Sequence, residues 1–204
     1  MKPAKLLIAA AIAAAPAYAA PQRTETAVLA GGCFWGMEAV FEHVKGVTNV
    51  VSGYAGGSAR DANYEAVGSE RTKHAEAVRI TYDPSRISYA HLLQIYFAVA
   101  HDPTQLNRQG NDIGTQYRSA IFPQNDEQDR KAREGITRAN VDHHGSVVTT
   151  IEGKGEWYPA EDYHQQYWEG EGQRNPYCLA VIPPKLQKLR KSFQARVKSA
   201  GAPA

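Results

Sequence analysis

The apolar and polar positions of the chain predict a short series of strands and helices. Residues 26–30 are typical of a buried strand. Apolar or aromatic residues then recur at intervals of three and four from residue 34 to residue 44, which predicts a helix. The further predicted elements, in chain order, are strand 47–54, strand 74–82, helix 88–99, strand 117–122, helix 125–140, strand 147–151, a short helix 160–167 and a last helix from residue 184 with an apolar stripe.

The order of these elements indicates the fold class. Strand, helix, strand, strand, helix, strand is the βαββαβ arrangement, and the remaining elements extend it. We expect an α+β fold, a two-layer sandwich with a ferredoxin-like βαββαβ core plus extensions. The segments 58–73 and 101–116 are predicted loops. A loop as long as 101–116 inside a compact domain is usually functional.

The first 19 residues have the three parts of a secretory signal peptide. A basic start is followed by an uncharged run at 6–15 and by Ala17-Tyr18-Ala19. A transmembrane helix needs about 20 apolar residues, so the run is too short for an anchor. We expect residues 1–19 to be cleaved, residues 20–204 to form a single domain, and the protein to be exported to the periplasm with no stable membrane association.

Signal cleavage changes the charge. The chain has 23 basic and 21 acidic residues, and removal of Lys2 and Lys5 leaves 21 of each. A formally neutral domain gives no reason to expect a nucleic-acid partner.

Residues 31–36, GGCFWG, stand between the first predicted strand and helix. The two glycines allow a tight turn. Cys33 is then expected in the first helical turn, where free N–H groups and the helix dipole stabilise an anion. We expect its pKa to lie below the value of about 8.5 for free cysteine. Because Phe34 and Trp35 add apolar surface, the segment predicts a nucleophile beside a pocket for a small apolar group.

Cys33 and Cys178 are the only cysteines of the sequence. In an exported protein two cysteines ordinarily form a structural disulfide. The surroundings of Cys33 favour a reactive thiol instead, because a structural bridge needs neither a helix N-terminus nor flanking aromatic residues. From the residues alone both interpretations stay open.

Four further residues are candidates for work on a substrate oxygen beside Cys33. Glu76 lies on an otherwise apolar strand; facing an aromatic pocket it would stay protonated near neutral pH, and the alternative is a solvent-facing position. Asp112 lies in a glycine-rich loop, where turn formation is the alternative role. Tyr64 and Tyr117 could donate hydrogen bonds or belong to the core.

The sequence gives only weak indications of a metal site or of another catalytic residue. His143 and His144 lack the spacing of metal ligands, and the sequence contains no HExxH or CxxC motif. His164 is expected to be a packing residue of a helix. With no phosphate loop or dinucleotide fingerprint either, cofactor-free thiol chemistry is the hypothesis that remains.

Five segments together resemble the A-type peptide methionine sulfoxide reductases. They are GCFWG at 32–36, HAE at 74–76, GNDIGTQYRS at 110–119, AEDYHQQY at 160–167 and NPYC at 175–178. The likeness extends over about residues 26 to 182. Such enzymes repair methionine sulfoxide.

The resemblance implies a role for each candidate around the sulfoxide group. Cys33 matches the nucleophile, and Phe34 and Trp35 match the aromatic residues that hold the S-methyl group. Glu76 matches the acid that protonates the sulfoxide oxygen. Cys178 matches a recycling cysteine, which makes a Cys33–Cys178 disulfide a turnover intermediate.

The remaining matches complete the expected site and partners. Tyr64 and Tyr117 match tyrosines that hydrogen-bond the oxygen, and Asp112 matches a supporting carboxylate. The resemblance implies reduction of the S epimer, free or in oxidised proteins, without a metal or other cofactor and with electrons from a thioredoxin-like dithiol. We expect a monomer. Two other hypotheses are a different thiol oxidoreductase, such as a peroxidase, and an exported binding domain with a structural disulfide.

The chain departs from the family pattern in two places. Residues 69–73, SERTK, replace a Gly-x-Thr-Gly turn before the HAE segment. A glycine-rich tail with a third cysteine is absent, and Pro183-Pro184 with a basic helix stands in its place. Without a third cysteine, recycling is expected to use one disulfide.

Overall fold

The computed structural model describes residues 23–153 and 156–199, so the predicted signal peptide lies outside the described residues. Its strands are β1 (Glu25–Gly31), β2 (Val47–Ala55), β3 (Ala75–Tyr82), β4 (Arg108–Gln109), β5 (Asp112–Ile113), β6 (Ser119–Phe122), β7 (Thr150–Ile151) and β8 (Trp157–Pro159). Its α-helices are α1 (Phe34–Glu42), α2 (Tyr64–Gly68), α3 (Tyr89–Ile95), α4 (Asp126–Asp142) and α5 (Pro176–Ser192).

One six-stranded sheet organises the fold, in the order β7-β6-β1-β3-β2-β8. Its pairings are antiparallel except for β6 with β7. The four inner strands β6-β1-β3-β2, with α1 and α3 in the connections, form the predicted βαββαβ core. The α+β prediction is confirmed.

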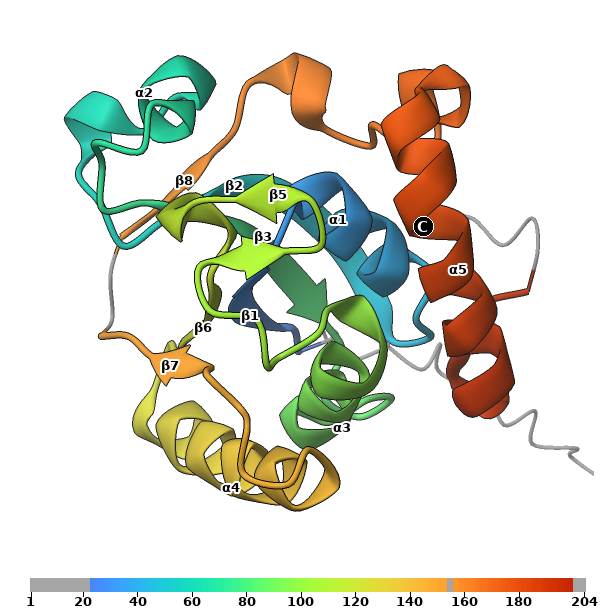
Figure 1. The fold of residues 1–204 in the computed structure, drawn as a ribbon. Helices are drawn as coiled ribbons and strands as arrows, with labels where there is room; N and C mark the ends of the chain where they lie inside the picture. Colours follow the sequence, from blue (N-terminus) through green and yellow to red (C-terminus); the bar gives the residue numbers. More distant parts are fainter. Residues whose placement is uncertain (1–22, 154–155, 200–204) are drawn as a thin grey trace, which may run out of the picture.

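Helices flank this sheet (Figure 1). Helix α1 packs on β1, β2 and β3, α5 packs on α1, and α4 packs on α3. Successive side chains of β1 point to opposite faces of the sheet, as in any β-strand. Ala27 and Leu29 join the large helix-side core, whereas Val28 and Ala30 join a smaller cluster with Phe122.

The predicted helix 160–167 is wrong. Only Asp162–His164 forms a 3-10 turn, and the residues before it form the edge strand β8. Strand β8 lies close to β2 because Gly53 has no side chain, and a Cβ there would meet the Tyr158 carbonyl oxygen at 2.3 Å. The Gln165 side chain accepts a hydrogen bond from the Ser52 N–H and donates one to the Ser52 carbonyl. These two bonds hold the segment extended.

The last helix begins eight residues earlier than predicted. Asn175 caps α5 through a 2.9 Å bond from the Tyr177 N–H to its side chain, and Pro176 occupies the first turn, where no N–H is needed. Pro183 and Pro184 lie inside the helix and are exposed. Our expectation that Pro184 starts this helix is therefore wrong.

Three smaller differences concern connections. Helix α3 ends in a π-helical turn at Tyr96–Ala100. The predicted loop 101–116 contains the β4–β5 hairpin, and a 3-10 turn at Thr115–Tyr117 leads into β6. The predicted strand 147–151 is reduced to β7 at its end.

Candidate active site

The turn between β1 and α1 presents Cys33. Gly32 has φ +90°, and a Cβ there would meet the Gln109 side chain at 2.7 Å, so the tight turn requires glycine. Cys33 is the N-cap residue of α1 rather than part of its first turn, and its carbonyl accepts from the N–H groups of Gly36 and Met37. Its thiol is free and partly buried.

The antiparallel pairing of β1 and β3 brings Glu76 to the end of the sheet at which β1 leads into Cys33. The end of β1 lies beside the start of β3, where Glu76 is located. Glu76 is buried, and its Oε2 accepts a 3.0 Å hydrogen bond from the backbone N–H of Phe34. The structure thus places the predicted acid against the residue that follows Cys33.

One cavity of about 190 Å³ gathers most of the predicted site residues. Its lining consists of Cys33, Phe34, Trp35, Tyr64, Glu76, Asp112, Tyr117 and Tyr177. Seven of these eight residues were predicted from the sequence, and they come from five separate segments of the chain. Aromatic side chains dominate the wall, which suits a small apolar group next to a thiol.

Burial determines the charge of Glu76. Removal from water raises the pKa of its carboxyl, the Phe34 hydrogen bond lowers it in part, and the Asp112 carboxylate raises it, with the result that the pKa lies at about 8. Glu76 is therefore predominantly a neutral acid at pH 7, as the sequence predicts. Since Oε2 accepts from Phe34, the other oxygen is left to carry the proton.

The pKa of Cys33 runs against our expectation. Burial raises it well above its usual value, Glu76 and Asp112 raise it further, and the Trp35 N–H and the Tyr177 hydroxyl lower it only in part. The helix N-terminus does act in the predicted direction, but desolvation outweighs it. Cys33 is thus a thiol at neutral pH, and the prediction of a lowered pKa is wrong.

Trp35 is held by two neighbours from the segment after β8. Its indole Nε1 donates to Nδ1 of His164 at 3.2 Å. Its ring stacks on Tyr167 with centroids 4.0 Å apart and planes 14° from parallel. Because His164 Nδ1 accepts, the imidazole is neutral and carries its hydrogen on Nε2. His164, predicted to be a packing residue, orients one wall of the cavity.

Tyr177 is the cavity residue that the sequence analysis missed. Its hydroxyl donates to the Asp112 carboxylate and also lies within hydrogen-bond reach of Cys33. Tyr177 therefore joins the Asp112 carboxylate of the long loop to Cys33. Its position in the NPYC segment directly before Cys178 was the available signal, since the resemblance implies a recycling role for Cys178 and so predicts that this segment lies near Cys33.

Cys178 lies outside this cavity. It is fully buried in α5, where it packs with Ala39, Ile182 and Leu186. Burial raises the pKa of its thiol to about 11. Both cysteines are free in this structure.

Within residues 23–153 and 156–199, no group of three or more His, Cys, Asp or Glu side chains could hold a metal ion. In the same part of the chain no helix is both long and apolar enough to cross a membrane.

Comparison with known proteins places this site in a family. The family model described as peptide methionine sulfoxide reductase matches residues 25–197. The chain belongs to the peptide methionine sulfoxide reductase family. It is an oxidoreductase that reduces methionine sulfoxide in a thiol-dependent reaction.

Individual relatives agree with this assignment to the A-type enzymes. The reductase is 61% identical over 172 residues to peptide methionine sulfoxide reductase MsrA of Erwinia tasmaniensis, covering 84% of this chain and 96% of that protein. It is 52% identical over 171 residues to MsrA of a Nitratiruptor species, covering 84% and 97%.

Solved structures of the family share the fold. Reduced Mxr1 of Saccharomyces cerevisiae aligns with a TM-score of 0.69 at 30% identity, over 77% of this chain and 88% of Mxr1. Methionine sulfoxide reductase A of Corynebacterium diphtheriae aligns with a TM-score of 0.65 at 37% identity, over 77% of each chain.

Proposed function

We propose that this reductase acts on the S epimer of methionine sulfoxide, free or in oxidised proteins, with Cys33 as nucleophile and Glu76 as acid. The observation that carries the proposal is that one small aromatic cavity holds both a free thiol and a buried carboxylic acid that is neutral at pH 7. A sulfoxide sulfur is a poor electrophile until its oxygen is protonated or strongly hydrogen-bonded.

Different residues of the cavity are suited to the methyl group and to the oxygen of the sulfoxide. Phe34 and Trp35 supply apolar surface for the S-methyl group. Tyr64 and Tyr117 line the cavity with Glu76, and burial raises the pKa of both hydroxyls, so they remain donors for the sulfoxide oxygen. The methyl group, the oxygen and the attacking Cys33 thiol thus have separate positions around the sulfur, and three fixed directions are what a site needs to distinguish two epimers.

The first step transfers an oxygen atom from substrate to enzyme. Cys33 Sγ attacks the sulfoxide sulfur while Glu76 gives its proton to the oxygen, and the carboxylate takes up the thiol proton. The attack forms a transient S–S bond, and the oxygen then passes as hydroxyl from the substrate sulfur to Cys33 Sγ. The S–O bond of the substrate and the transient S–S bond break, an S–O bond forms at Cys33, methionine leaves, and Cys33 becomes a sulfenic acid. The thiol sulfur is oxidised by two electrons and the substrate sulfur is reduced by two.

The second step returns the enzyme toward its starting state. The Cys178 thiol condenses with the Cys33 sulfenic acid, releasing water and forming a disulfide. A thioredoxin-like dithiol then reduces this disulfide, and no other cofactor takes part. Mxr1 of yeast forms a complex with Trx2, which supports a donor of this class.

A single-turnover experiment with resolved epimers tests the proposal. Reduced enzyme without a dithiol donor is mixed with the S or R sulfoxide, and thiols are titrated before and after. We expect one equivalent of methionine from the S epimer and the loss of both thiols. Hydrogen peroxide serves as the comparison substrate: rapid turnover of peroxide with none of the sulfoxide would indicate a peroxidase.

We also propose that residues 1–19 are a signal peptide and that the mature enzyme works in the periplasm as a monomer. The basic start, the uncharged run and the Ala17-Tyr18-Ala19 ending support export, and the family match begins only at residue 25. Mass spectrometry of enzyme from a periplasmic fraction is expected to give an N-terminus at Ala20. An intact Met1 contradicts export, and light scattering of the mature enzyme tests the monomer.

A further inference from the structure

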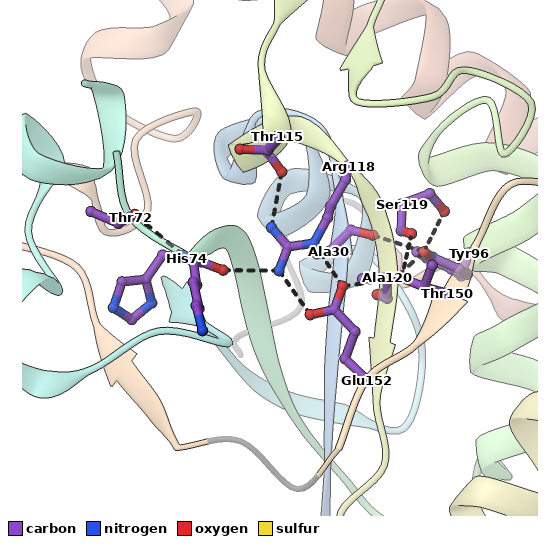
Figure 2. A network of polar contacts seen from close by, with 11 residues as sticks. Ala30, Thr72, His74, Tyr96, Thr115, Arg118, Ser119, Ala120, Thr150 and Glu152 are labelled. Atoms are coloured by element: carbon purple, nitrogen blue, oxygen red, sulfur yellow. Dashed lines mark hydrogen bonds and ion pairs between the residues drawn. The ribbon is translucent and has the colours of Figure 1, made fainter. Parts of the chain in front are cut away.

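Arg118 lies between the cavity residue Tyr117 and strand β6, and its guanidinium joins three segments (Figure 2). Nε and Nη2 donate to the two carboxylate oxygens of Glu152 at 2.7 and 2.8 Å. Nη1 donates to the Thr115 carbonyl at 2.9 Å, and Nη2 also donates to the Lys73 carbonyl at 3.0 Å. The ion pair is bidentate, the strongest form of such a contact.

The surroundings of this ion pair are built to hold it. The side chains of Arg118 and Glu152 are only 16% and 27% exposed. Thr150 donates a further hydrogen bond to Glu152, and the Arg118 charge helps to lower the pKa of that carboxyl. Gly56 leaves the necessary space, because a Cβ there would lie 3.0 Å from Nη2.

The hydrogen bonds of Arg118 to the Thr115 and Lys73 carbonyls connect the two segments that carry Tyr117 and Glu76. Thr115 begins the 3-10 turn that ends at Tyr117, whereas Lys73 directly precedes the His74-Ala75-Glu76 segment. Both Tyr117 and Glu76 line the cavity, but Arg118 itself does not. The guanidinium therefore ties the turn that carries the tyrosine to the strand that carries the acid.

The hydrogen bond from Arg118 to the Lys73 carbonyl holds the loop at 69–73, whose sequence departs from the family pattern. Arg118 binds a backbone carbonyl of that loop, so the contact does not depend on which side chain residue 73 carries. His74 continues the support: its backbone N–H donates to Thr72, and its buried Nε2 bonds the Ser58 carbonyl. The end of the loop is thus fixed although its sequence departs from the family pattern.

We propose that Arg118 and Glu152 are positioning residues that fix the Tyr117 hydroxyl relative to Glu76 for attack on the sulfoxide. This inference rests on the proposed roles of Tyr117 and Glu76. Arg118 is outside the cavity, so it acts through the tyrosine. The methyl-binding wall of Phe34 and Trp35 has other supports, so substrate binding depends less on Arg118 than the chemical step does.

Arg118→Lys is the first test, because lysine keeps the charge but lacks the planar fork that serves a carboxylate and two carbonyls together. We expect the saturating single-turnover rate to fall about 10- to 100-fold, the usual result of misplacing a catalytic group by about an ångström. The sulfoxide concentration for half-saturation should change less than about threefold. Glu152→Gln should act in the same direction.

Two controls separate positioning from a general structural effect. Arg133 makes a comparable bidentate pair with Asp129 on the exposed surface of α4, and Arg133→Lys should leave the rate unchanged. The alkylation rate of Cys33 by iodoacetamide needs no oxygen-side residue, so it should stay constant in Arg118→Lys. A parallel fall of alkylation and sulfoxide reduction would overturn the proposal.

A double-mutant cycle with Tyr117→Phe decides whether Arg118 acts through the tyrosine. If it does, Arg118→Lys should have little further effect once the Tyr117 hydroxyl is absent. Losses that simply multiply would overturn the proposal, as would an unchanged rate in Arg118→Lys alone. If the parent enzyme itself fails to reduce the S sulfoxide, the proposed function fails, and the two failures are thereby distinguished.

Discussion

The backbone N–H of Phe34 and Oε2 of Glu76 are joined by a 3.0 Å hydrogen bond. This bond joins the Glu76 carboxyl on β3 to the residue that directly follows Cys33, and so fixes the position of Glu76 relative to the turn that carries Cys33. It also occupies one carboxyl oxygen and leaves the other for the proton. Because the contact uses backbone of α1, the geometry of the acid does not depend on a flexible side-chain partner.

Glu76→Gln should slow sulfenic-acid formation by about 10²-fold or more, the usual scale for loss of a general acid. Glutamine keeps the volume of the side chain and can accept from Phe34, but it has no acidic proton to give. Single-turnover methionine release measures the rate. Because Glu76 also raises the pKa of Cys33, its removal should not slow the iodoacetamide reaction of that thiol, so slower methionine release cannot be ascribed to a less reactive Cys33. An unchanged release rate would exclude Glu76 as the acid.

The rate of sulfoxide reduction should fall as the pH rises through about 8. The pKa of Glu76 is raised to about 8, so the proton that the reaction needs is present below that pH and lost above it. The pKa of Cys33 is raised well above its usual value, so this thiol stays protonated over the same pH range. Its ionisation therefore does not oppose the fall in rate near pH 8. Stopped-flow profiles of kcat/KM between pH 6 and pH 10 test this; a rate that rises through pH 8 would contradict it.

The same titration affects stability. The folded-state pKa of Glu76 lies above its ordinary value, so the folded enzyme binds the proton more tightly than the unfolded chain. This contribution to the free energy of unfolding is complete below about pH 4.5 and is lost as the pH rises through about 8. Urea unfolding at pH 6 and pH 9 should therefore show a smaller decrease for Glu76→Gln than for the parent.

Cysteine substitutions separate the two chemical steps. Cys33→Ser should abolish reduction and leave the fold intact, since the thiol is free and makes no structural bridge. Cys178→Ser should still release one equivalent of methionine but accumulate a Cys33 sulfenic acid that dimedone traps. Continued multiple turnover of Cys178→Ser with a thioredoxin donor would show that Cys178 is not required, and unfolding of Cys33→Ser would favour a structural disulfide.

Local patterns were sufficient for the core of the fold. The glycine turn before Cys33 and the apolar spacing of α1 depend on neighbouring residues, so they are visible in the sequence. Strand β8 was not, because it depends on the absence of a side chain at Gly53 in another strand. The early start of α5 shows a competing signal: the Asn175 cap and Pro176 begin the helix, and Pro184 only resembles a start.

The residues of the site were predicted more fully than their charges. Family resemblance and local context identified Cys33 and Glu76 and their aromatic neighbours. The stabilising effect of a helix N-terminus on Cys33 is local and was anticipated. The opposing effects come from burial and from Glu76 and Asp112, which only the folded chain brings to the thiol. A pKa depends on that balance, so its direction could not be predicted from the GCFWG segment.

Tyr177→Phe should make Cys33 less reactive toward alkylation. The Tyr177 hydroxyl is a hydrogen-bond donor that lowers the pKa of the Cys33 thiol, and it also donates to Asp112. Its removal takes away a donor to the thiolate and leaves the Asp112 charge without that donor, so both effects should raise the Cys33 pKa further.

The pH dependence of iodoacetamide alkylation measures this change directly. We expect the midpoint to move to higher pH in Tyr177→Phe, and the rate at pH 8 to fall about 10-fold for each unit of displacement. Tyr163→Phe is the matched control, because Tyr163 is exposed and does not line the cavity. A midpoint that stays in place or moves to lower pH would show that Tyr177 supports Asp112 alone, and the hydroxyl would then have no part in activating the nucleophile.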